Sequence, residues 1–359
     1  MDAPAEASVT GLRDLSVLGG RWFSTRAGPG YVIESRYEGA HSHGSVALHR
    51  ALGADTGRLA RQAGDARLDG IPIRDYLFID TETTGLGGAG TLVFLAGVAR
   101  FEGSTLLLRQ FILPSPADEP GLLDGLGEEL DAAKVLVSFN GKSFDLPALE
   151  ARAIMARKRP AWRILPHLDL LHPNRRLFRG TLSAHRLIHL EKELLKFERE
   201  DDCPSAEVPM RYFRFQATGD PTWIRPVLRH NAWDILSLVA LTALLSGVHD
   251  GEAGPLQAAR AAVYERDWEH AAANFVEVLS NDPPRAVELE AREGAARALS
   301  RIARHEDAAE QWRCLLAAQG RRLLFPYVEL AKVLEHRLRK PTEALAVVDA
   351  ALSQIEKGL

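Results

Sequence analysis

Hydrophobic and polar positions follow two different periods along the chain, and the change between them predicts two kinds of structure. Short apolar runs bounded by turn residues predict strands at 76–79, 91–101, 105–113 and 135–138. Helical spacing appears at 118–133 and 144–157, and weakly at 55–68. Three strands in hairpin-like succession, followed by alternating helix and strand, predict an α/β fold with a mixed sheet flanked by helices.

The pattern from residue 255 onward is purely helical and predicts six helices in three antiparallel pairs. Three similar segments place Ala271, Ala308 and Ala344 at intervals of 37 and 36 residues. A period of this length, with a small residue at the close helix contact, resembles tetratricopeptide-like repeats. An irregular helical bundle is the alternative. A repeat stack would offer a surface for a protein partner.

These patterns divide the 359 residues into three predicted parts. Residues 1–70 form an N-terminal extension that packs on the core, 71–250 form the α/β domain, and 255–359 form an all-α helical-repeat domain. A chain of this length exceeds one comfortable hydrophobic core.

The composition indicates which class of protein and which cellular compartment to expect. Hydrophobic residues make up 46% and charged residues 26%, which is typical of a soluble globular protein. No basic region leads into an apolar stretch at the start, and the longest uncharged apolar run, 235–248, is too short to span a bilayer. The two cysteines are far apart and suit a reducing compartment. We therefore expect a cytoplasmic protein without a membrane partner.

The net charge of −4 weighs against a polyanionic partner, but the charge is unevenly distributed. Residues 151–190 contain nine basic residues and one acid, and eight of the nine are arginines. A local basic excess matters more than the total for binding nucleic acid, and the guanidinium group suits phosphate. A solvated helix face is the alternative interpretation.

The first candidate chemistry lies directly after an apolar strand, where Asp80 and Glu82 occur in the sequence Asp-Thr-Glu-Thr-Thr-Gly-Leu. Residues two apart on a strand point to the same face, so both carboxylates would lie side by side. Their repulsion would require a cation, and oxygen ligands favour Mg²⁺ or Mn²⁺ over Zn²⁺. A polar turn after a strand is the alternative.

Two other features of the sequence resemble ligand sites but are not interpreted as such. The glycines of 85–90 formally match a dinucleotide-binding fingerprint, but the next residues predict a strand where that fingerprint needs a helix, so they predict a flexible turn beside the metal site. His41 and His43 have no third ligand nearby and are interpreted as surface histidines.

Two further segments carry acids at the start of helices. Asp145 lies in the first turn of the helix predicted at 144–157, where helix capping would also explain it. His230 and Asp234 open a long apolar helix and share one face at a spacing of four. A helix-start acid with a nearby histidine is the alternative for this pair.

Together these segments resemble the DEDD superfamily of 3′-5′ exonucleases, which have a ribonuclease H-like fold. The wider chain, over roughly residues 20–245, is similar to the YprB-like ribonuclease H-like proteins, which often carry tetratricopeptide repeats. The residues behind that match are 85–94, 139–147, 167–173, 199–202 and 230–238. Histidine-type members usually have four residues between histidine and aspartate, whereas this chain has three, the spacing of tyrosine-type members.

The resemblance implies a metal-dependent nuclease acting on DNA or RNA by a two-metal mechanism. Asp80, Glu82, Asp145 and Asp234 would hold two Mg²⁺ or Mn²⁺ ions, and His230 would act as general base, since free imidazole titrates near neutrality. The candidate substrate-binding residues are Thr83, Asn140, Lys142, Phe144, Asp169, Arg175, Arg176 and Arg179. A structure-specific endonuclease and a catalytically idle nucleic-acid scaffold are the alternative functions.

Overall fold

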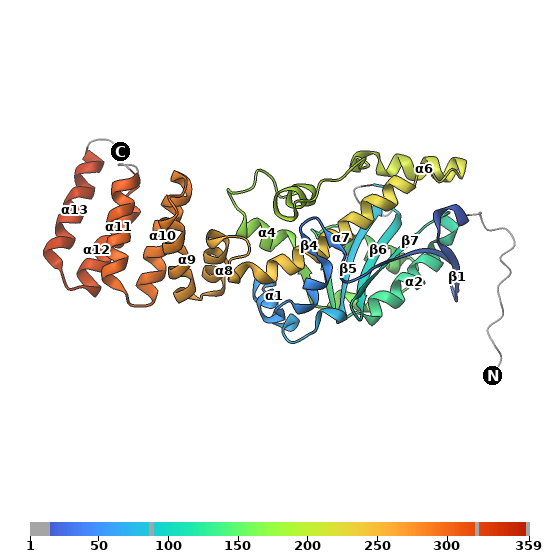
Figure 1. Cartoon of the computed structure of the whole chain (residues 1–359), viewed down its shortest axis with the longest axis horizontal. Coiled ribbons are helices and arrows are strands. Elements are labelled where there is room, and N and C mark those ends of the chain that lie inside the picture. Colours follow the sequence, from blue (N-terminus) through green and yellow to red (C-terminus); the bar gives the residue numbers. More distant parts are fainter. Residues whose placement is uncertain (1–14, 86–89, 320–322, 357–359) are drawn as a thin grey trace. The chain divides into compact units, whose positions relative to one another are not determined.

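The computed structural model describes residues 15–85, 90–319 and 323–356, and the chain divides into two compact units (Figure 1). The first unit runs to Ser246 and the second begins at Gly247. The glycine turn predicted at 85–90 lies mostly outside the described residues. Both cysteines are free.

A seven-stranded mixed sheet forms the centre of the first unit, in the order β1-β2-β7-β6-β5-β8-β9. The strands are β1 (Arg21–Thr25), β2 (Gly28–Tyr37), β5 (Tyr76–Thr83), β6 (Val93–Glu102), β7 (Thr105–Ile112), β8 (Val135–Ser138) and β9 (His167–Asp169). β5 pairs in parallel with β8, as β8 does with β9, whereas the strands from β1 to β5 pair antiparallel. The mixed α/β sheet expected from the sequence is therefore present.

The N-terminal segment contributes directly to this sheet. β2 pairs with β7 along seven residues, and β1 forms the outer edge. Residues 21–37, assigned above to an extension that packs on the core, are thus strands of the core sheet itself. A small hairpin, β3 (Ser42–His43) and β4 (Val46–Ala47), follows.

Helices cover both faces of the sheet. The helices of the first unit are α1 (Thr56–Ala63), α2 (Glu119–Ala132), α3 (Asp145–Met155), α4 (Leu171–Leu177), α5 (Leu187–Leu190), α6 (Val208–Thr218) and α7 (Arg225–Gly247). Leucines of α2 and α3 pack with Phe111 and Ile79 in one large apolar core, where Tyr212 of α6 stacks on Phe94 at 4.1 Å. Burial of these side chains provides most of the driving force for folding.

Helix α7 crosses the strands on the other face (Figure 1). Asp80, Gly97 and Gln110 lie in register on three neighbouring strands, and Asn231 of α7 contacts all three. A Cβ at Gly97 would lie 2.2 Å from the Asn231 Oδ1 atom, so glycine allows the helix to approach this closely. This contact sets the depth at which α7 presents its side chains to β5.

Helix α7 is also the one helix in the described chain that is long and apolar enough to cross a membrane by length and composition. Within the protein, 78% of its most apolar window is buried. Its apolar character is therefore explained by its place in the core.

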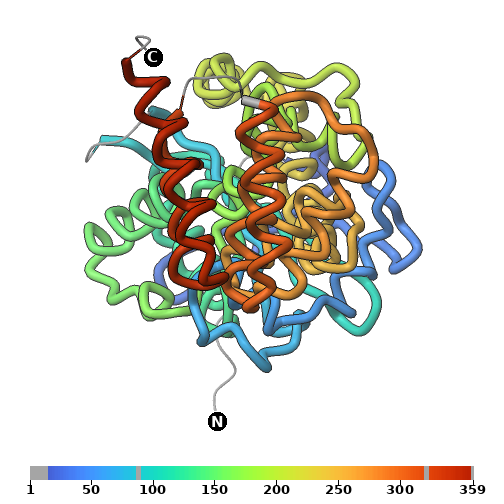
Figure 2. Tube along the Cα trace, turned by 90° about the vertical axis from the view of Figure 1, so that its left-hand side faces the viewer, coloured from blue at the N-terminus to red at the C-terminus, as the bar shows by residue number. Residues whose placement is uncertain are grey.

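The second unit is entirely helical over its described residues. It contains α8 (Pro255–Glu265), α9 (Trp268–Ser280), α10 (Arg285–Arg301), α11 (His305–Gln319), α12 (Phe325–Lys332) with a π-helical turn at Val333–Arg337, and α13 (Pro341–Glu356). Successive helices lie side by side (Figure 1), and Figure 2 shows the last of them, α13, nearest the viewer. The alanines at 271, 308 and 344 are all buried in helix contacts, as expected, and the assignment to the tetratricopeptide class stays a prediction.

Candidate active site

The predicted carboxylate pair lies at the end of β5. This strand continues past its apolar half through Asp80 and Glu82 to Thr83. Asn231 donates a hydrogen bond to Asp80 Oδ2 at 2.8 Å. No hydrogen bond to a Glu82 carboxylate oxygen is formed within the described part of the chain, although its side chain is only 14% exposed. Two carboxylates with so few donors require another source of positive charge.

Asp145 joins this pair from the first turn of α3. Its Oδ1 atom accepts hydrogen bonds from the Thr81 backbone N–H at 2.9 Å and from the Thr81 hydroxyl at 2.6 Å. Thr81 lies between the two β5 carboxylates, so these bonds hold the third carboxylate against the same strand end. The contact to β5, more than helix capping, explains the place of Asp145.

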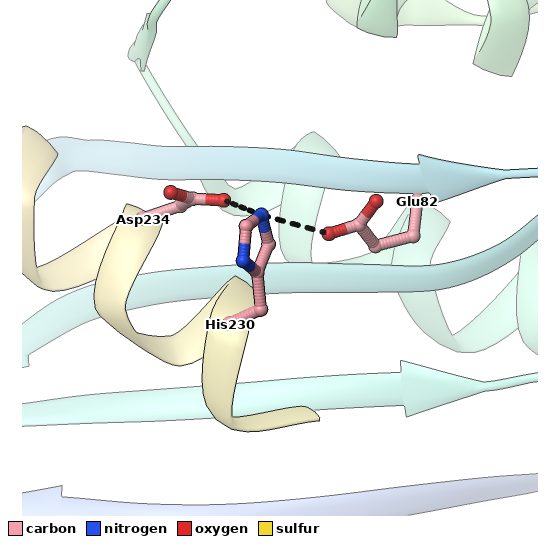
Figure 3. Close-up of side chains that lie close together, drawn as sticks. All are labelled: Glu82, His230 and Asp234. Carbon is pink, nitrogen blue, oxygen red and sulfur yellow. Dashed lines mark ion pairs between the residues drawn. The ribbon is translucent and has the colours of Figure 1, made fainter. Parts of the chain in front are cut away.

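The fourth carboxylate comes from α7 together with the predicted histidine. His230 Nε2 lies 3.5 Å from Asp234 Oδ2 and 4.0 Å from Glu82 Oε1 (Figure 3). One atom from each of these three residues falls within 4.8 Å of the others. The three-residue gap between His230 and Asp234 therefore places both on one face of the helix, toward β5.

Asp202 fixes the orientation of the histidine ring. Its Oδ1 atom lies 2.7 Å from His230 Nδ1. A carboxylate can only accept, and the Arg199 Nη1 atom lies farther from the same nitrogen, at 3.1 Å, so the shorter bond to Asp202 places the proton on Nδ1 and leaves the Nε2 lone pair facing Glu82 and Asp234. The ring is thus arranged to accept a proton at Nε2.

Arg199 holds Asp234 from the other side. It donates to Asp234 Oδ1 and forms two hydrogen bonds, at 2.6 and 2.7 Å, with the buried Glu191 carboxylate. The Arg199 side chain is only 3% exposed. With Oδ1 of Asp234 bonded to the guanidinium, Oδ2 is the oxygen that faces His230.

This network also corrects the interpretation of His43 as a surface residue. His43 is buried, its Nε2 atom lies 2.7 Å from the Ser237 hydroxyl, and Ser237 donates to Glu191 at 2.6 Å. Burial lowers the pKa of His43 to about 3, so it is neutral at physiological pH. His41 is exposed, as expected.

The acids raise one another's pKa values. Burial, followed by repulsion from Asp234 and Asp145, raises the pKa values of Asp80 and Glu82 well above their usual range. Burial likewise raises the pKa of Asp145 to about 6. A site that disfavours charge on its own carboxylates is one that a divalent cation would stabilise.

The residues present fit a hard divalent ion. Carboxylate oxygens of Asp80, Glu82, Asp145 and Asp234 converge from three elements, β5, α3 and α7. An all-oxygen set of this kind suits Mg²⁺ or Mn²⁺.

The pKa shifts predict a pH-dependent stability for metal-free protein. A carboxyl whose pKa is higher in the folded than in the unfolded state binds more protons when folded, so stability falls as pH rises through that window. For Asp145 the window runs from the ordinary value of 3.8 to about 6. We expect the melting temperature in chelator to fall as pH rises across this range.

Metal binding should reverse this loss of stability. At neutral pH, Mn²⁺ at a hundred times its Kd should add about 2.7 kcal/mol to the free energy of unfolding. A melting temperature that Mn²⁺ leaves unchanged would contradict a metal site.

The second predicted motif forms a tight turn beside the site. Asn140 has a left-handed backbone (φ 67°), and the Asn140 and Lys142 N–H groups donate to Asp169 at 2.7 and 3.2 Å. The Asp169 side chain is fully buried, so it supports this turn and is not placed to touch substrate. Lys142 and Phe144 are exposed on the turn, and Thr83 donates to the Gly85 carbonyl at 2.7 Å.

Much of the basic stretch is already engaged in structural contacts. Arg152 pairs with Glu119, Lys158 with Asp124 and Arg163 with Glu150. Arg176 donates to the backbone and side chain of Gln62 at 2.8 and 2.7 Å, so its predicted phosphate contact is not supported. Arg175 and Arg179 are exposed. The local charge excess therefore overstated the surface available to nucleic acid.

Sequence reasoning did not assign roles to Arg199, Asp202 and Asn231. Arg199 and Asp202 lie in an irregular segment without periodicity, although residues 199–202 belonged to the resemblance. Asn231 directly follows His230, and an amide residue at the start of a long apolar helix was the available signal.

Comparison with known proteins identifies relatives of this chain. Residues 77–246 match the RNase_H superfamily family model. The uncharacterized protein YprB of Bacillus subtilis (strain 168) is 32% identical over 334 residues, which cover 90% of this chain and 80% of YprB. The family B DNA polymerase of the hyperthermophilic archaeon Pyrobaculum calidifontis matches with a TM-score of 0.40 and 16% identity, over 58% of this chain and 30% of the polymerase. The chain therefore belongs to the YprB family and contains a domain of the ribonuclease H superfamily.

Proposed function

We propose that this protein is a metal-dependent nuclease that hydrolyses phosphodiester bonds, cutting single-stranded nucleic acid from its 3′ end. The observation that carries the proposal is the meeting of four carboxylates and one oriented histidine at the end of β5. The DEDD-like spacing of these residues supports the exonucleolytic direction.

Each side chain has a defined task in this proposal. Asp80, Glu82, Asp145 and Asp234 would hold two Mg²⁺ or Mn²⁺ ions, which when bound supply positive charge to the phosphate and acidify water. His230 Nε2 accepts the proton of the attacking water. Asp202 keeps the other ring proton on Nδ1, and Arg199 keeps Asp234 Oδ2 turned inward.

The direct test uses purified full-length protein with end-labelled single- and double-stranded DNA and RNA. We expect cleavage with Mg²⁺ or Mn²⁺, loss of cleavage in excess chelator, and mononucleotide products released from the 3′ end. Internal fragments as first products would favour the endonuclease alternative. Full activity in chelator would overturn the metal-dependent mechanism.

We further propose that the helical unit binds a protein partner and contributes nothing to the chemistry. A truncation that ends at Gly251 retains every proposed metal ligand, so the folded core should cut short substrates at a rate within a few-fold of the full chain. Circular dichroism checks that the core is folded. A folded but inert core would mean that the helical unit helps to build the active site.

A further inference from the structure

A cavity of about 530 Å³ lies beside the proposed active site and has no part in the mechanism above. One wall comes from β2, including Tyr37, and the other from a face of α7 that carries Arg225, Arg229 and Trp233. Its size is that of pockets that take small ligands. The β2 wall precedes residue 77, so it lies outside the stretch that matches the ribonuclease H superfamily.

The cavity lining is positively charged. It includes Arg225 and Arg229 and contains no aspartate or glutamate. Arg225 donates to the Val17 carbonyl at 2.8 Å and Arg229 to the Asp201 carbonyl, and neither forms an ion pair with a carboxylate within the described residues. Asp220 attracts Arg225 at longer range, but in the described chain neither guanidinium is neutralised by a direct ion pair, so together they favour an anion, and their geometry suits phosphate.

Three aromatic side chains also contribute to the lining. Tyr37, Phe197 and Trp233 all border the cavity. The Arg229 guanidinium lies 5.1 Å from the Trp233 ring centre, and Phe197 meets Trp233 edge-on at 5.8 Å. Aromatic side chains of this kind stack nucleobases without reading their sequence.

The cavity is connected to the catalytic residues. Arg229 and Trp233 immediately precede His230 and Asp234, so the two pairs lie about 100° apart around α7. Gln110, which lines the cavity, donates to Asn231 at 2.9 Å, and Asn231 donates to Asp80. A ligand in the cavity would thus lie against the helix that carries the proposed base.

We infer that this cavity binds one nucleotide unit, with its phosphate at Arg225 and Arg229 and its base among Tyr37, Phe197 and Trp233. The inference rests on the proposed nuclease function and adds a subsite to it. The same chemistry would accept a nucleotide of the substrate strand or a free nucleoside monophosphate.

The test measures binding without cleavage, using the full-length protein in chelator. A fluorescent single-stranded oligonucleotide is titrated by anisotropy, and a nucleoside 5′-monophosphate is added as competitor. In the double variant Arg225→Gln/Arg229→Gln we expect roughly tenfold weaker oligonucleotide binding. The matched control Arg26→Gln/Arg74→Gln removes the same charge from exposed positions outside the cavity and should change binding by less than twofold.

A second arm tests the base. An abasic oligonucleotide of the same length and charge should bind wild-type protein at least about fivefold more weakly, because stacking is lost. Trp233→Leu should reduce this difference, with folding checked by thermal melting. Competition by the free monophosphate identifies a free-nucleotide site, and its absence identifies the substrate strand.

Unchanged binding of both ligands by the folded double variant would overturn the subsite. If that variant still cuts with Mn²⁺ at the normal KM, the subsite is wrong and the nuclease proposal stands. If wild-type protein binds the oligonucleotide but never cuts it, the nuclease proposal fails while the subsite stands.

Discussion

Replacing Asp80 by asparagine is expected to lower phosphodiester cleavage by at least roughly 10³-fold, because a metal ligand supplies several kcal/mol of transition-state stabilisation. Asparagine has nearly the same shape and still offers an oxygen to the Asn231 amide, so the fold should be retained. Removing one charge from four crowded carboxylates should also raise the melting temperature of metal-free protein. Lower activity together with higher metal-free stability separates a ligand from a structural residue.

Asp75→Asn is the matched control for this variant. Asp75 lies immediately before β5 and forms a surface ion pair with Lys134 at 2.7 Å. Such pairs contribute about 0–1 kcal/mol, so its activity and its response to Mn²⁺ should match wild type. An Asp80→Asn protein that cuts at the wild-type rate would remove Asp80 from the mechanism.

The central part of the fold could be predicted because its signals are local. Val135–Ser138 is a strand with the predicted bounds, and β6, β7, α2 and α3 differ from their predicted ranges by at most two residues at each end. The strand at 76–79 continues to Thr83, since the pairing of β5 with β6 extends past the apolar residues. Hydrophobic periodicity detects the buried part of a strand and misses the polar part that carries the site.

The place of β2 in the sheet could not be predicted from local sequence in the same way. Its sequence, Gly28–Tyr37, contains glycines and charged residues, and its place is set by pairing with β7, whose partner residues are 69 to 81 positions later in the chain. Long-range pairing leaves no local periodicity. The burial of His43 could not be predicted for the same reason, because it depends on a contact with Ser237 of α7, far along the chain.

The candidate site was predictable as far as its residues form motifs. Asp80, Glu82, Asp145, His230 and Asp234 do come together. The groups that orient them, Arg199, Asp202 and Glu191, lie on irregular or short helical segments and are recognised only by their contacts. Residue type and spacing therefore predicted which groups would carry the chemistry, while their orientation depends on buried ion pairs.

Charge counting, in contrast, misjudged which arginines are available to bind nucleic acid. Charge counting favoured residues 151–190 as the nucleic-acid surface, yet Arg152 and Arg176 are held by Glu119 and Gln62. Arg225 and Arg229, outside that stretch, line a cavity without acids. A count of charges cannot distinguish a guanidinium that is already paired from one that is available.

The second large effect is expected at His230. If His230 Nε2 takes the proton of the attacking water, His230→Ala should lower the cleavage rate by roughly 10²- to 10⁴-fold. The affinity for Mn²⁺ should change little, because four carboxylates remain to hold the ions. This separation of rate from metal affinity distinguishes the variant from Asp80→Asn, which should weaken both.

Asp202→Asn provides the finer test of the same assignment. An asparagine amide can donate to Nδ1, which would shift the ring proton to Nε2 and block it as a base. We therefore expect a rate loss in this variant although its own side chain touches neither metal ligand nor substrate. If His230 only packs against α7, both variants would lose stability and still cut within a few-fold of the wild-type rate per folded molecule. That outcome would leave water activation to the bound ions alone.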